Sequence, residues 1–364
     1  MRIGIDIRKY HDFGIGTYIQ NLMNVYQHRE DFDCIYFGND DIQSEISRLK
    51  KGSFIADNSP KYSLQELTSV SKKANSQQLN LFHSPHYTYP INLNVPGVVT
   101  VHDIIHLRMK KYYSLPKRAY AFCMIRHACA ASSAIIVDSA FGKEELLTVF
   151  RIPEKKIHVV PLGADEVFSD KLKDNDKEAI VRKYGITKSY ILYTGSLKPH
   201  KNVPTLLKAF RTIRHRHDVQ LVFTGERISE VPQLQRYVVE NGLSDSVLDL
   251  GRIPKEELKA VYQSARAVVL PSLYEGFGFS MLEAMASGVP AVGARATSIT
   301  EVVGDAGLLF DPMDDSELAG HLDDILTNES LRISLVSKGT ERAKQFTWKQ
   351  CADRTIDIYH EVLK

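Results

Sequence analysis

The chain has 364 residues, 43% of them hydrophobic and 25% charged, which is the balance of a soluble globular protein long enough for about two domains. Its 46 Lys and Arg residues against 44 Asp and Glu residues give a formal net charge of +2, so we expect no nucleic-acid partner. No CxxC pair occurs, which argues against structural zinc and favours a reducing compartment; the cysteines are Cys34, Cys123, Cys129 and Cys351.

The N-terminal residues, MRIGIDIRKYHD, have the pattern of a strand rather than of a signal peptide. No run approaches the roughly 20 uninterrupted apolar residues of a membrane span. We therefore expect a cytoplasmic protein without a transmembrane segment.

Short apolar runs rich in β-branched residues recur through the first half of the chain. Each run is too short for a buried helix, so each is predicted to be a parallel strand buried on both faces. These runs are RIGIDI at 2–7, CIYF at 34–37, LNLFH at 79–83, GVVTVH at 97–102 and AIIVDS at 134–139.

A second series of such runs follows, separated by helical windows such as PTLLKAFRTIRHR and KEELKAVYQSA. Alternating strands and helices predict an α/β fold of two Rossmann-like, doubly wound domains that face each other across a cleft. We place them at 1–168 and 169–345, joined near the polar stretch 169–180, with a C-terminal helix at 346–364 packing back on the first domain. The runs are 190–195, 219–225, 246–251, 265–272 and 289–294.

Two glycines follow the first strand. Gly14 and Gly16 immediately precede a helical pattern, where they could let backbone N–H groups approach a phosphate. The segment GIGTYI lacks the third glycine of a dinucleotide fingerprint, so a tight turn with positive φ is the alternative. Asp6 and Arg8, at the strand end, would line the cleft or form a surface ion pair.

Polar and aromatic residues surround the end of the strand at 97–102. His102 and Asp103 follow it directly, and a histidine there could hydrogen-bond a sugar hydroxyl or a developing charge, or serve only the structure. The preceding segment, FHSPHYTYP, is suited either to stacking on sugars or to packing as a proline-held loop. Its candidate side chains are His83, His86, Tyr87 and Tyr89.

A glycine turn with two lysines ends the strand at 190–195. Gly195 and Ser196 form the turn, and Lys198 and Lys201 follow before a helix, where a lysine would supply a point charge for a diphosphate. The pattern GxxxxGK[ST] is absent, so this is no phosphate loop of a nucleotide triphosphatase. Solvated surface lysines are the alternative.

The most specific segment is PSLYEGFGFSMLEAMASGVP, at 271–290. A glycine-flanked Glu275 precedes a short helix that we expect from near Ser280 to Gly288. The free N–H groups and the positive dipole end of that helix favour a pyrophosphate. Glu283, eight residues after Glu275, could accept both hydroxyls of a ribose.

Capping boxes are the competing interpretation of two pairs in this region. Ser280 and Glu283 have S-x-x-E spacing, so Glu283 could reach back to its own helix start. Ser298 and Glu301 have the same spacing at the next helix. Glu275 has no such structural alternative.

These segments resemble the retaining glycosyltransferases of family 4, which have the two-Rossmann-domain GT-B architecture. The resemblance covers nearly the whole chain and rests on the EX7E signature, Glu275 to Glu283, and on GSLKPHKN, VVPLGAD and EVVGDAGLLFDP. It implies that Glu275 contacts the donor sugar, that Glu283 holds the ribose and that Lys201 neutralises the diphosphate. His102 matches the histidine that meets the sugar near its anomeric centre.

The resemblance assigns further contacts. The loop of Gly14 and Gly16 would close on the diphosphate, and Asp103, His86 and Tyr87 would lie on the acceptor side. Many members carry an arginine where this chain has Ser196, so the charge would rest on Lys201, with Lys198 in support. The remaining donor-binding residues would be Gly195, Ser196, Gly276, Phe277, Gly278, Phe279 and Ser280.

The implied reaction is transfer of a hexose with retention, in which the departing nucleotide diphosphate deprotonates the acceptor. It requires no protein nucleophile, no metal and no other cofactor. The segments FHSPHYTYP and VHDIIHL look like bacterial mannosyltransferases of cell-surface polysaccharides. We therefore expect GDP-mannose as the donor, with a UDP-sugar as the alternative, and a glycan or lipid-linked saccharide as the acceptor.

A basic segment at 108–126, RMKKYYSLPKRAYAFCMIR, interleaves cations with aromatics. It suits peripheral contact with an anionic membrane surface, or it is only a solvated face. Two rival functions are a nucleotide-sugar 2-epimerase of the same fold, which would not need the EX7E block, and an inactive scaffold. The presence of Glu275, Glu283 and Lys201 disfavours the scaffold.

Overall fold

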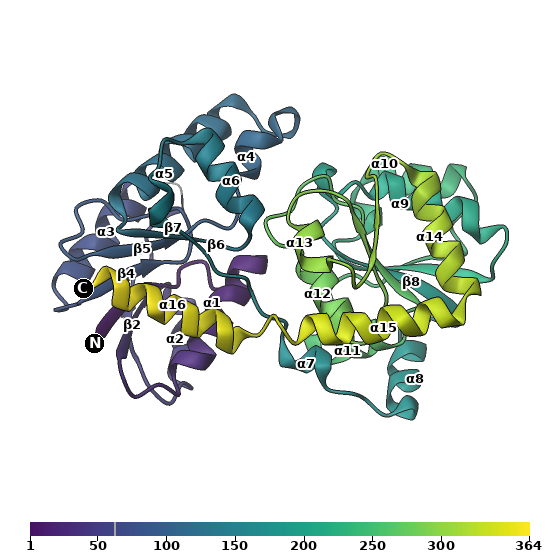
Figure 1. The fold of residues 1–364 in the computed structure, drawn as a ribbon, viewed down its shortest axis with the longest axis horizontal. Helices are drawn as coiled ribbons and strands as arrows, with labels where there is room; N and C mark the ends of the chain where they lie inside the picture. The colour runs from purple at the N-terminus through teal and green to yellow at the C-terminus, as the bar shows by residue number, and fades with distance from the viewer. Residues whose placement is uncertain (62) are drawn as a thin grey trace. The chain divides into compact units, whose positions relative to one another are not determined.

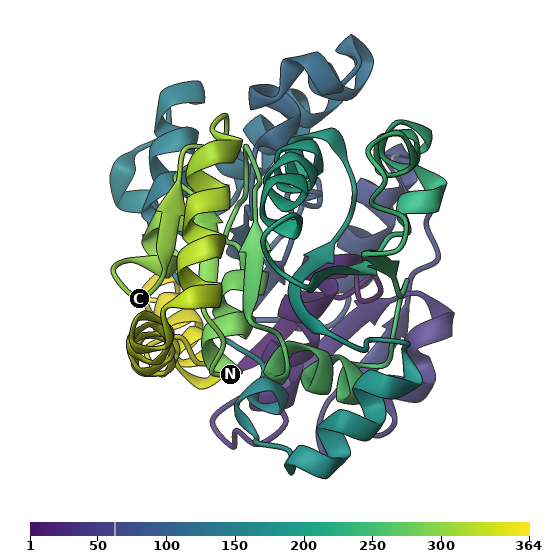
Figure 2. The same cartoon turned by 90° about the vertical axis from the view of Figure 1, so that its right-hand side faces the viewer.

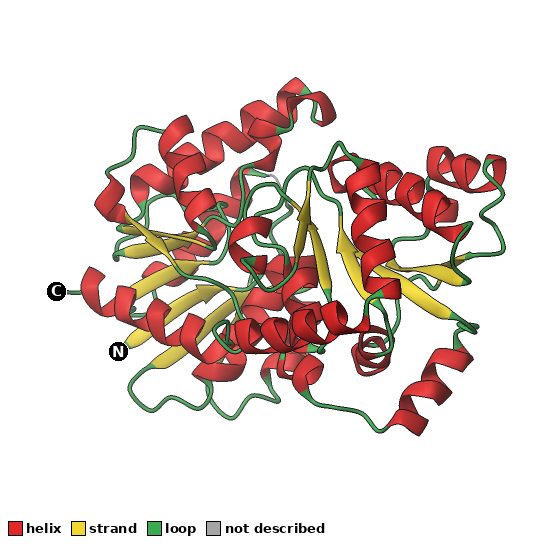
Figure 3. Cartoon of the chain, turned by 45° about the vertical axis from the view of Figure 1, so that its right-hand side comes forward, coloured by secondary structure: helices red, strands yellow, loops and turns green. Residues whose placement is uncertain are grey.

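The computed structural model describes residues 1–61 and 63–364, which form two compact units. The first unit comprises residues 1–163 and 348–364, and the second comprises 164–347. Each contains one parallel sheet flanked by helices (Figure 1, Figure 3). The polar stretch 169–180, expected at the join, belongs to the second unit, because its later residues enter helix α8 (Asp174–Lys183), which packs on α11 (Lys255–Gln263).

The sheet of the first unit has the order β3-β2-β1-β4-β5-β6-β7, and all of its pairings are parallel. All five runs expected to be strands in this unit are confirmed. Two further strands were not predicted, because their three or four residues include polar side chains. The strands are β1 (Arg2–Asp6), β2 (Asp33–Gly38), β3 (Ser53–Ala56), β4 (Leu81–Ser84), β5 (Gly97–Thr100), β6 (Ala134–Val137) and β7 (Ile157–Val159).

Helices from both ends of the chain cover this sheet. The C-terminal helix α16 (Trp348–Val362) packs on α1 (Phe13–Tyr26), and Figure 1 shows it in yellow beside the first elements. The other helices of the unit are α2 (Gln43–Ile46), α3 (Leu64–Asn75), α4 (Ile105–Arg108), α5 (Leu115–Ala131) and α6 (Ala140–Val149).

A buried polar chain fastens α16 to the sheet. The hydroxyl of Tyr359 lies 2.6 Å from Nδ1 of His83, whose Nε2 lies 2.8 Å from Oγ1 of Thr100. His83 is fully buried, and burial lowers its pKa to about 3. The imidazole is therefore neutral and is part of the core rather than of a sugar site.

The sheet of the second unit has the order β10-β9-β8-β11-β12-β13, again all parallel. The five expected strands are confirmed, and β13, three residues long, was not predicted. The chain order reverses between β8 and β11, and in open α/β sheets a ligand binds at the carboxyl ends of such strands. The strands are β8 (Ser189–Gly195), β9 (Val219–Gly225), β10 (Val247–Asp249), β11 (Ala267–Leu270), β12 (Ala291–Ala294) and β13 (Leu308–Phe310).

Two helix pairs pack around this second sheet, α9 with α14 and α12 with α15, and Figure 2 shows helices on both of its faces. The four central strands, β8, β9, β11 and β12, are largely buried, as expected for a doubly wound sheet, whereas the outer strands β10 and β13 are partly exposed. Besides α8 and α11, the helices are α7 (Glu166–Ser169), α9 (Val203–Arg214), α10 (Pro232–Glu240), α12 (Phe279–Ala286), α13 (Ile299–Val303), α14 (Asp315–Thr327) and α15 (Glu329–Ala343).

Candidate functional site

An ion pair joins the two strands at which the chain order of the second unit reverses. Nζ of Lys201, which follows β8, lies 2.6 Å from Oε1 of Glu275, which follows β11. The side chains expose only 19% and 13% of their surface. The fully buried Ser272 donates a second hydrogen bond to the same carboxylate oxygen, at 2.6 Å. The two residues with the clearest predicted roles are therefore in direct contact.

The turn that carries Lys201 is held by its neighbour. Residues Pro199–Lys201 form a single 3-10 turn, and Asn202 follows with φ +54°, in the left-handed region. The side-chain amide of Asn202 donates to the carbonyls of Pro271, at 3.1 Å, and Pro312, at 2.7 Å. It thereby ties the lysine turn to the chain that leaves β11.

Residues at the start of α13 hold the loop that carries Glu275. The hydroxyl of Ser298 donates to the carbonyls of Glu275 and Phe277, at 3.0 and 3.1 Å, and the amide of Glu275 donates to Oγ1 of Thr297 at 3.1 Å. The side chain of Ser298 makes no cap hydrogen bond to its own helix, α13. The serine half of the capping box, the competing interpretation for Ser298 and Glu301, is therefore not formed, because the hydroxyl bonds to the loop.

Helix α12 begins one residue earlier than expected, at Phe279, with Gly278 as its N-cap at φ +104°. Gly276 and Phe277 precede that cap, and Ser280 is buried at the second helical position. No side chain caps this helix start. Its N-terminal amides, which carry the positive end of the helix dipole, follow directly from the loop of Glu275.

Glu283 has a partner other than its own helix start. The hydroxyl of Tyr262, on α11, donates to Oε2 of Glu283 at 2.6 Å. The competing capping-box interpretation of Ser280 and Glu283 is wrong, because Gly278 and not Ser280 is the N-cap. Burial raises the pKa of Glu283, and the hydrogen bond from Tyr262 opposes that rise. Tyr262 is fully buried, with its ring packed edgewise on Phe168.

The turn at Gly195 and Ser196 depends on two glycines with positive φ. Gly195 has φ +138° and Gly225 has φ +108°. A Cβ on Gly225 would lie 2.4 Å from the carbonyl oxygen of Gly195, so only glycine fits beside this strand end. The carboxylate of Glu226 accepts a hydrogen bond from the amide of Leu197 at 2.7 Å, which orients the turn.

In the first unit, His102 has hydrogen-bond acceptors at both ring nitrogens. Nδ1 lies 2.8 Å from Oδ2 of Asp138, which follows β6, and Nε2 lies 3.1 Å from the carbonyl oxygen of Pro85. Burial lowers the pKa of His102, but the carboxylate of Asp138 outweighs it and the pKa is raised. The ring of Tyr18 packs perpendicular to His102, with centroids 5.0 Å apart.

The residues expected on the acceptor side are partly engaged in local structure. Oδ1 of Asp103 accepts a hydrogen bond from the amide of Ile105 at 3.0 Å. His86 stacks on Tyr87 with ring centroids 3.9 Å apart, and burial lowers the pKa of His86 well below its usual value. Tyr87 is 8% exposed and packs in the core with Tyr89, so His86 is the more accessible of the stacked pair.

The two N-terminal glycines lie inside a helix rather than before it. Helix α1 begins at Phe13, so Gly14 and Gly16 fall in its first turn, and neither has positive φ. A Cβ on Gly16 would lie 2.3 Å from the carbonyl oxygen of Tyr10, which requires glycine for close approach rather than for a turn.

Asp6 and Arg8 form a buried pair rather than a surface one. Nε and Nη2 of Arg8 lie 2.9 and 2.6 Å from the two carboxylate oxygens of Asp6, and each residue is 6% exposed. Nη1 of Arg8 also donates to the carbonyl of Glu66 at 2.8 Å. The pair thus connects the end of β1 to α3.

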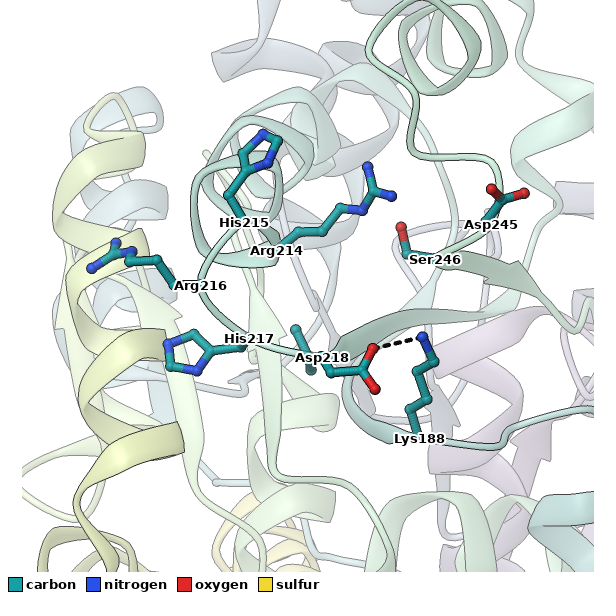
Figure 4. A pocket seen from close by; sticks show the side chains of 9 residues that line it. Lys188, Arg214, His215, Arg216, His217, Asp218, Asp245 and Ser246 are labelled. Atoms are coloured by element: carbon teal, nitrogen blue, oxygen red, sulfur yellow. Dashed lines mark hydrogen bonds and ion pairs between the residues drawn. The ribbon is translucent and has the colours of Figure 1, made fainter.

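A cavity of about 320 Å³ lies at the amino-terminal ends of β8 and β9, whereas Lys201 and Glu275 follow the carboxyl ends of β8 and β11 (Figure 4). Its charges are largely paired: Lys188 contacts Asp218 at 2.6 Å, and Arg216 and His217 both contact Asp323. It lacks the strand-end geometry described above. The lining residues are Lys188, Arg214, His215, Arg216, His217, Asp218, Val219, Asp245 and Ser246.

Over residues 1–61 and 63–364, no three His, Cys, Asp or Glu side chains are grouped to hold a metal ion. Within the same residues, every helix is too short or too polar to cross a membrane.

Several residues of these sites were not singled out from the sequence. Asp138 lies at the end of the predicted strand at 134–139, and His102 ends the predicted strand at 97–102. These two strands are neighbours in the sheet, so two polar residues at their carboxyl ends could have been predicted to meet. The partners of Glu275 and Glu283 had no usable signal, because serine, threonine and tyrosine occur throughout the chain. These partners are Tyr262, Ser272, Thr297 and Ser298.

Two family models match the chain, one for each half. The model described as Glycosyltransferase Family 4 matches residues 14–168, and that described as Glycosyl transferases group 1 matches residues 176–342.

Among proteins of similar sequence is the O-antigen chain mannosyltransferase B of Escherichia coli, 32% identical over 284 residues, which are 77% of this chain and 74% of that protein. The MMP alpha-(1->4)-mannosyltransferase of Mycolicibacterium hassiacum is 30% identical over 284 residues, 74% of this chain and 66% of that protein. A sucrose-phosphate synthase from Thermosynechococcus elongatus has the same fold, with a TM-score of 0.83, 18% identity, and coverage of 100% of this chain and 99% of that one. HepE of Anabaena, solved with UDP and glucose, gives a TM-score of 0.81 at 18% identity, with coverage of 99% and 100%.

Proposed function

The chain belongs to the family 4 glycosyltransferases of GT-B fold, and from that premise we propose that it transfers mannose from GDP-mannose with retention and without a metal. The acceptor is a glycan or lipid-linked saccharide. The contact of Lys201 with Glu275 across the switch point of the second unit is the observation that carries the proposal.

Charge supports a diphosphate at this place. The leaving group of the reaction gains negative charge in the transition state, and fixed cations and dipoles stabilise that charge without reorganisation. Lys201 provides one positive group, and the start of α12, whose N-cap is Gly278, provides the amides of a helix N-terminus. Together they can fill the role that a divalent cation has in metal-dependent transferases.

The state of His102 supports retention over inversion. An inverting transferase needs a general base to deprotonate the attacking hydroxyl, and an Asp–His pair is a suitable one. Here Nε2 of His102 faces the carbonyl oxygen of Pro85, so this nitrogen carries a proton and cannot accept one. The departing diphosphate remains as the base, as in front-face transfer with retention.

The names of the two curated relatives favour mannose as the sugar, since both are mannosyltransferases. Glu283 favours a nucleotide whose ribose it can hold: Oε2 is fixed by Tyr262, which orients the carboxylate for the ribose hydroxyls. UDP-sugars form the second candidate class of donor, and the experiment below includes them.

We further propose that the exposed face of α5 contacts an anionic membrane surface that carries the acceptor. Leu115 is 71% exposed and Phe122 is 39% exposed, and Lys117 and Arg126 are exposed on the same helix. Exposed apolar side chains beside cations are the pattern of peripheral helices at anionic lipid. Flotation with vesicles of anionic and of neutral lipid, using the wild type and Phe122→Ser, tests this contact.

The donor proposal is tested by titrating GDP-mannose, GDP, UDP-glucose and UDP into the purified chain with and without EDTA. We expect binding and slow donor hydrolysis with GDP-mannose, and no effect of EDTA. Glu275→Ala should abolish turnover while GDP still binds, and Lys201→Ala should weaken GDP binding by roughly 10-fold. Binding of no nucleotide in the panel, or equal loss of binding and turnover in Glu275→Ala, would contradict the proposal.

A further inference from the structure

We propose that Asp138 is a positioning residue that keeps His102 doubly protonated and fixed at the end of β5, as a cation for the sugar transfer. The inference rests on the proposed function for the part of His102 in the reaction. The protonation state itself rests only on the geometry around the ring.

Both hydrogen-bond partners of His102 are acceptors. The carboxylate oxygen of Asp138 faces Nδ1 at 2.8 Å, and the carbonyl oxygen of Pro85 faces Nε2 at 3.1 Å. A neutral imidazole has one N–H, so one of its nitrogens would direct a lone pair at an oxygen lone pair. The imidazolium donates to both oxygens, and with Asp138 ionised it is the form that satisfies both contacts. Burial raises the pKa of Asp138, and the interaction with His102 opposes that rise.

The burial of Asp138 points to function rather than stability. Asp138 is 2% exposed, and its Oδ1 is buried without a hydrogen-bond partner among the described residues. An ionised carboxylate with one oxygen unsatisfied costs the fold free energy, and replacing a buried ion pair by neutral groups is often neutral or stabilising. A carboxylate retained under these conditions is explained by what it does to His102.

The other titratable groups around the pair do not replace Asp138 as a source of negative charge. Asp103, next in the chain to His102, raises the pKa of the imidazole after Asp138, and it is partly exposed. Burial raises the pKa of the Tyr18 phenol and of the Cys351 thiol, so both stay neutral. Burial lowers the pKa of His83, which is therefore also neutral. His86 is neutral for the same reason.

The cation has a defined task in the proposed reaction. As the bond between the anomeric carbon and the nucleotide diphosphate breaks, its electron pair goes to the phosphate oxygen. The acceptor oxygen forms the new bond to the anomeric carbon, and the phosphate oxygen takes the proton of that hydroxyl. A fixed positive charge stabilises the negative charge that develops on the departing phosphate oxygen. An imidazolium whose two protons are held by Asp138 and Pro85 contributes charge without exchanging a proton.

Histidine-selective NMR tests the protonation state without any donor. In the full-length protein, the ring signals that vanish in His102→Gln identify His102, and their pH titration gives its pKa. We expect the wild-type midpoint to lie above about 6.5, the value of an unperturbed histidine, and Asp138→Asn to lower it by about one pH unit or more. Asp138→Glu should restore part of the shift.

The pH profile of kcat/KM for donor turnover then tests the functional part. Because the protonated form is the active one, activity falls as the pH rises through the pKa of His102, and Asp138→Asn should move this alkaline limb to lower pH by the same amount. Asp323→Asn is the matched control. It removes another aspartate–histidine contact, the 2.6 Å pair of Asp323 with His217, which lies just before β9 in the second unit. This control should leave the profile unchanged.

Two results would overturn the inference: an unchanged His102 titration in Asp138→Asn, or an unchanged alkaline limb. Wild-type protein that shows the expected titration but turns over no donor would instead contradict the proposed function. The two failures are therefore distinguishable.

Discussion

Lys201 and Glu275 form a direct ion pair, with Nζ and Oε1 2.6 Å apart and both side chains mostly buried. The cation proposed to meet the diphosphate is thus bound to the carboxylate proposed to meet the sugar. A donor must exchange these partners, because a diphosphate oxygen that binds Lys201 releases Glu275 for a sugar hydroxyl.

This exchange predicts opposite effects of Glu275→Gln on binding and on turnover. The amide cannot form the ion pair, so Lys201 is free for the diphosphate, and we expect GDP to bind up to about fivefold tighter, or about 1 kcal/mol. Turnover of the donor should fall by at least about 100-fold, since the carboxylate is lost. Calorimetric titration with GDP and an assay of donor turnover measure the two effects.

Glu257→Gln is the control for that prediction, because it removes an ion pair with Lys183 of similar length, 2.7 Å, from an exposed place in the same unit. It should change neither quantity. Weaker GDP binding in Glu275→Gln would show that Glu275 holds the loop rather than competing for Lys201.

Tyr262→Phe should make nucleotide binding more sensitive to acid. The hydrogen bond from Tyr262 lowers the pKa of Glu283, which burial has raised, so the phenylalanine variant has a still higher pKa at Glu283. Protonated Glu283 loses acceptor capacity for ribose, and affinity for GDP therefore falls as the pH decreases through that pKa. In Tyr262→Phe the fall in GDP affinity should begin at a higher pH than in the wild type. At a pH where Glu283 is ionised in the wild type but protonated in the variant, the variant should bind GDP roughly 10-fold more weakly.

The comparison for this experiment is Tyr184→Phe, which removes another tyrosine–glutamate hydrogen bond, that to Glu257. Its GDP affinity should follow the wild-type pH curve. Coinciding curves for Tyr262→Phe and the wild type would exclude Glu283 from the nucleotide site.

Gly16→Ala and Gly320→Ala should change stability in opposite directions, although both glycines lie in helices. A Cβ on Gly16 meets the carbonyl oxygen of Tyr10 at 2.3 Å, whereas a Cβ on Gly320 meets nothing within 4 Å. We expect Gly16→Ala to reduce the free energy of unfolding by about 2 kcal/mol and Gly320→Ala to increase it by about 0.5–1 kcal/mol. Chemical denaturation followed by circular dichroism measures both, and equal shifts would contradict the prediction.

His83 should make the first unit sensitive to acid. Its folded pKa of about 3 lies below the unfolded value, so below about pH 6.5 the unfolded chain binds a proton that the folded chain does not. Stability is therefore complete above pH 6.5 and is lost towards pH 3, by up to about 1.4 kcal/mol per pH unit. His83→Gln should flatten this slope in melting curves recorded between pH 4 and 7; an unchanged slope would assign acid sensitivity to other groups.

Strands were predictable where an apolar run was rich in β-branched residues and too short to be a buried helix. The exceptions are β3, β7 and β13, which have three or four residues each. Such segments are strands because a neighbouring strand offers its free edge, and that partner lies far away in the sequence. Their own composition carries too little signal for prediction.

Within the candidate site, spacing singled out Glu275 and Glu283, and position at a strand end singled out Lys201, but neither could indicate what these residues contact. Ser298 and Glu283 both matched a capping pattern, which describes only bonds within one helix. In the structure the hydroxyl of Ser298 reaches another loop and Glu283 reaches Tyr262 on another helix. Both groups bond to residues distant in the sequence rather than to their own helix, because folding brings those partners next to them.

The return of α16 to the first unit has a consequence for synthesis in the cell. Residues 164–347 are contiguous and can fold as soon as they leave the ribosome, whereas the first unit lacks Tyr359, the partner of His83, until the last helix emerges. We therefore expect the second unit to fold before the first, against the order of translation. The early residues would meanwhile depend on chaperones, and truncation after residue 347 would leave them permanently incomplete.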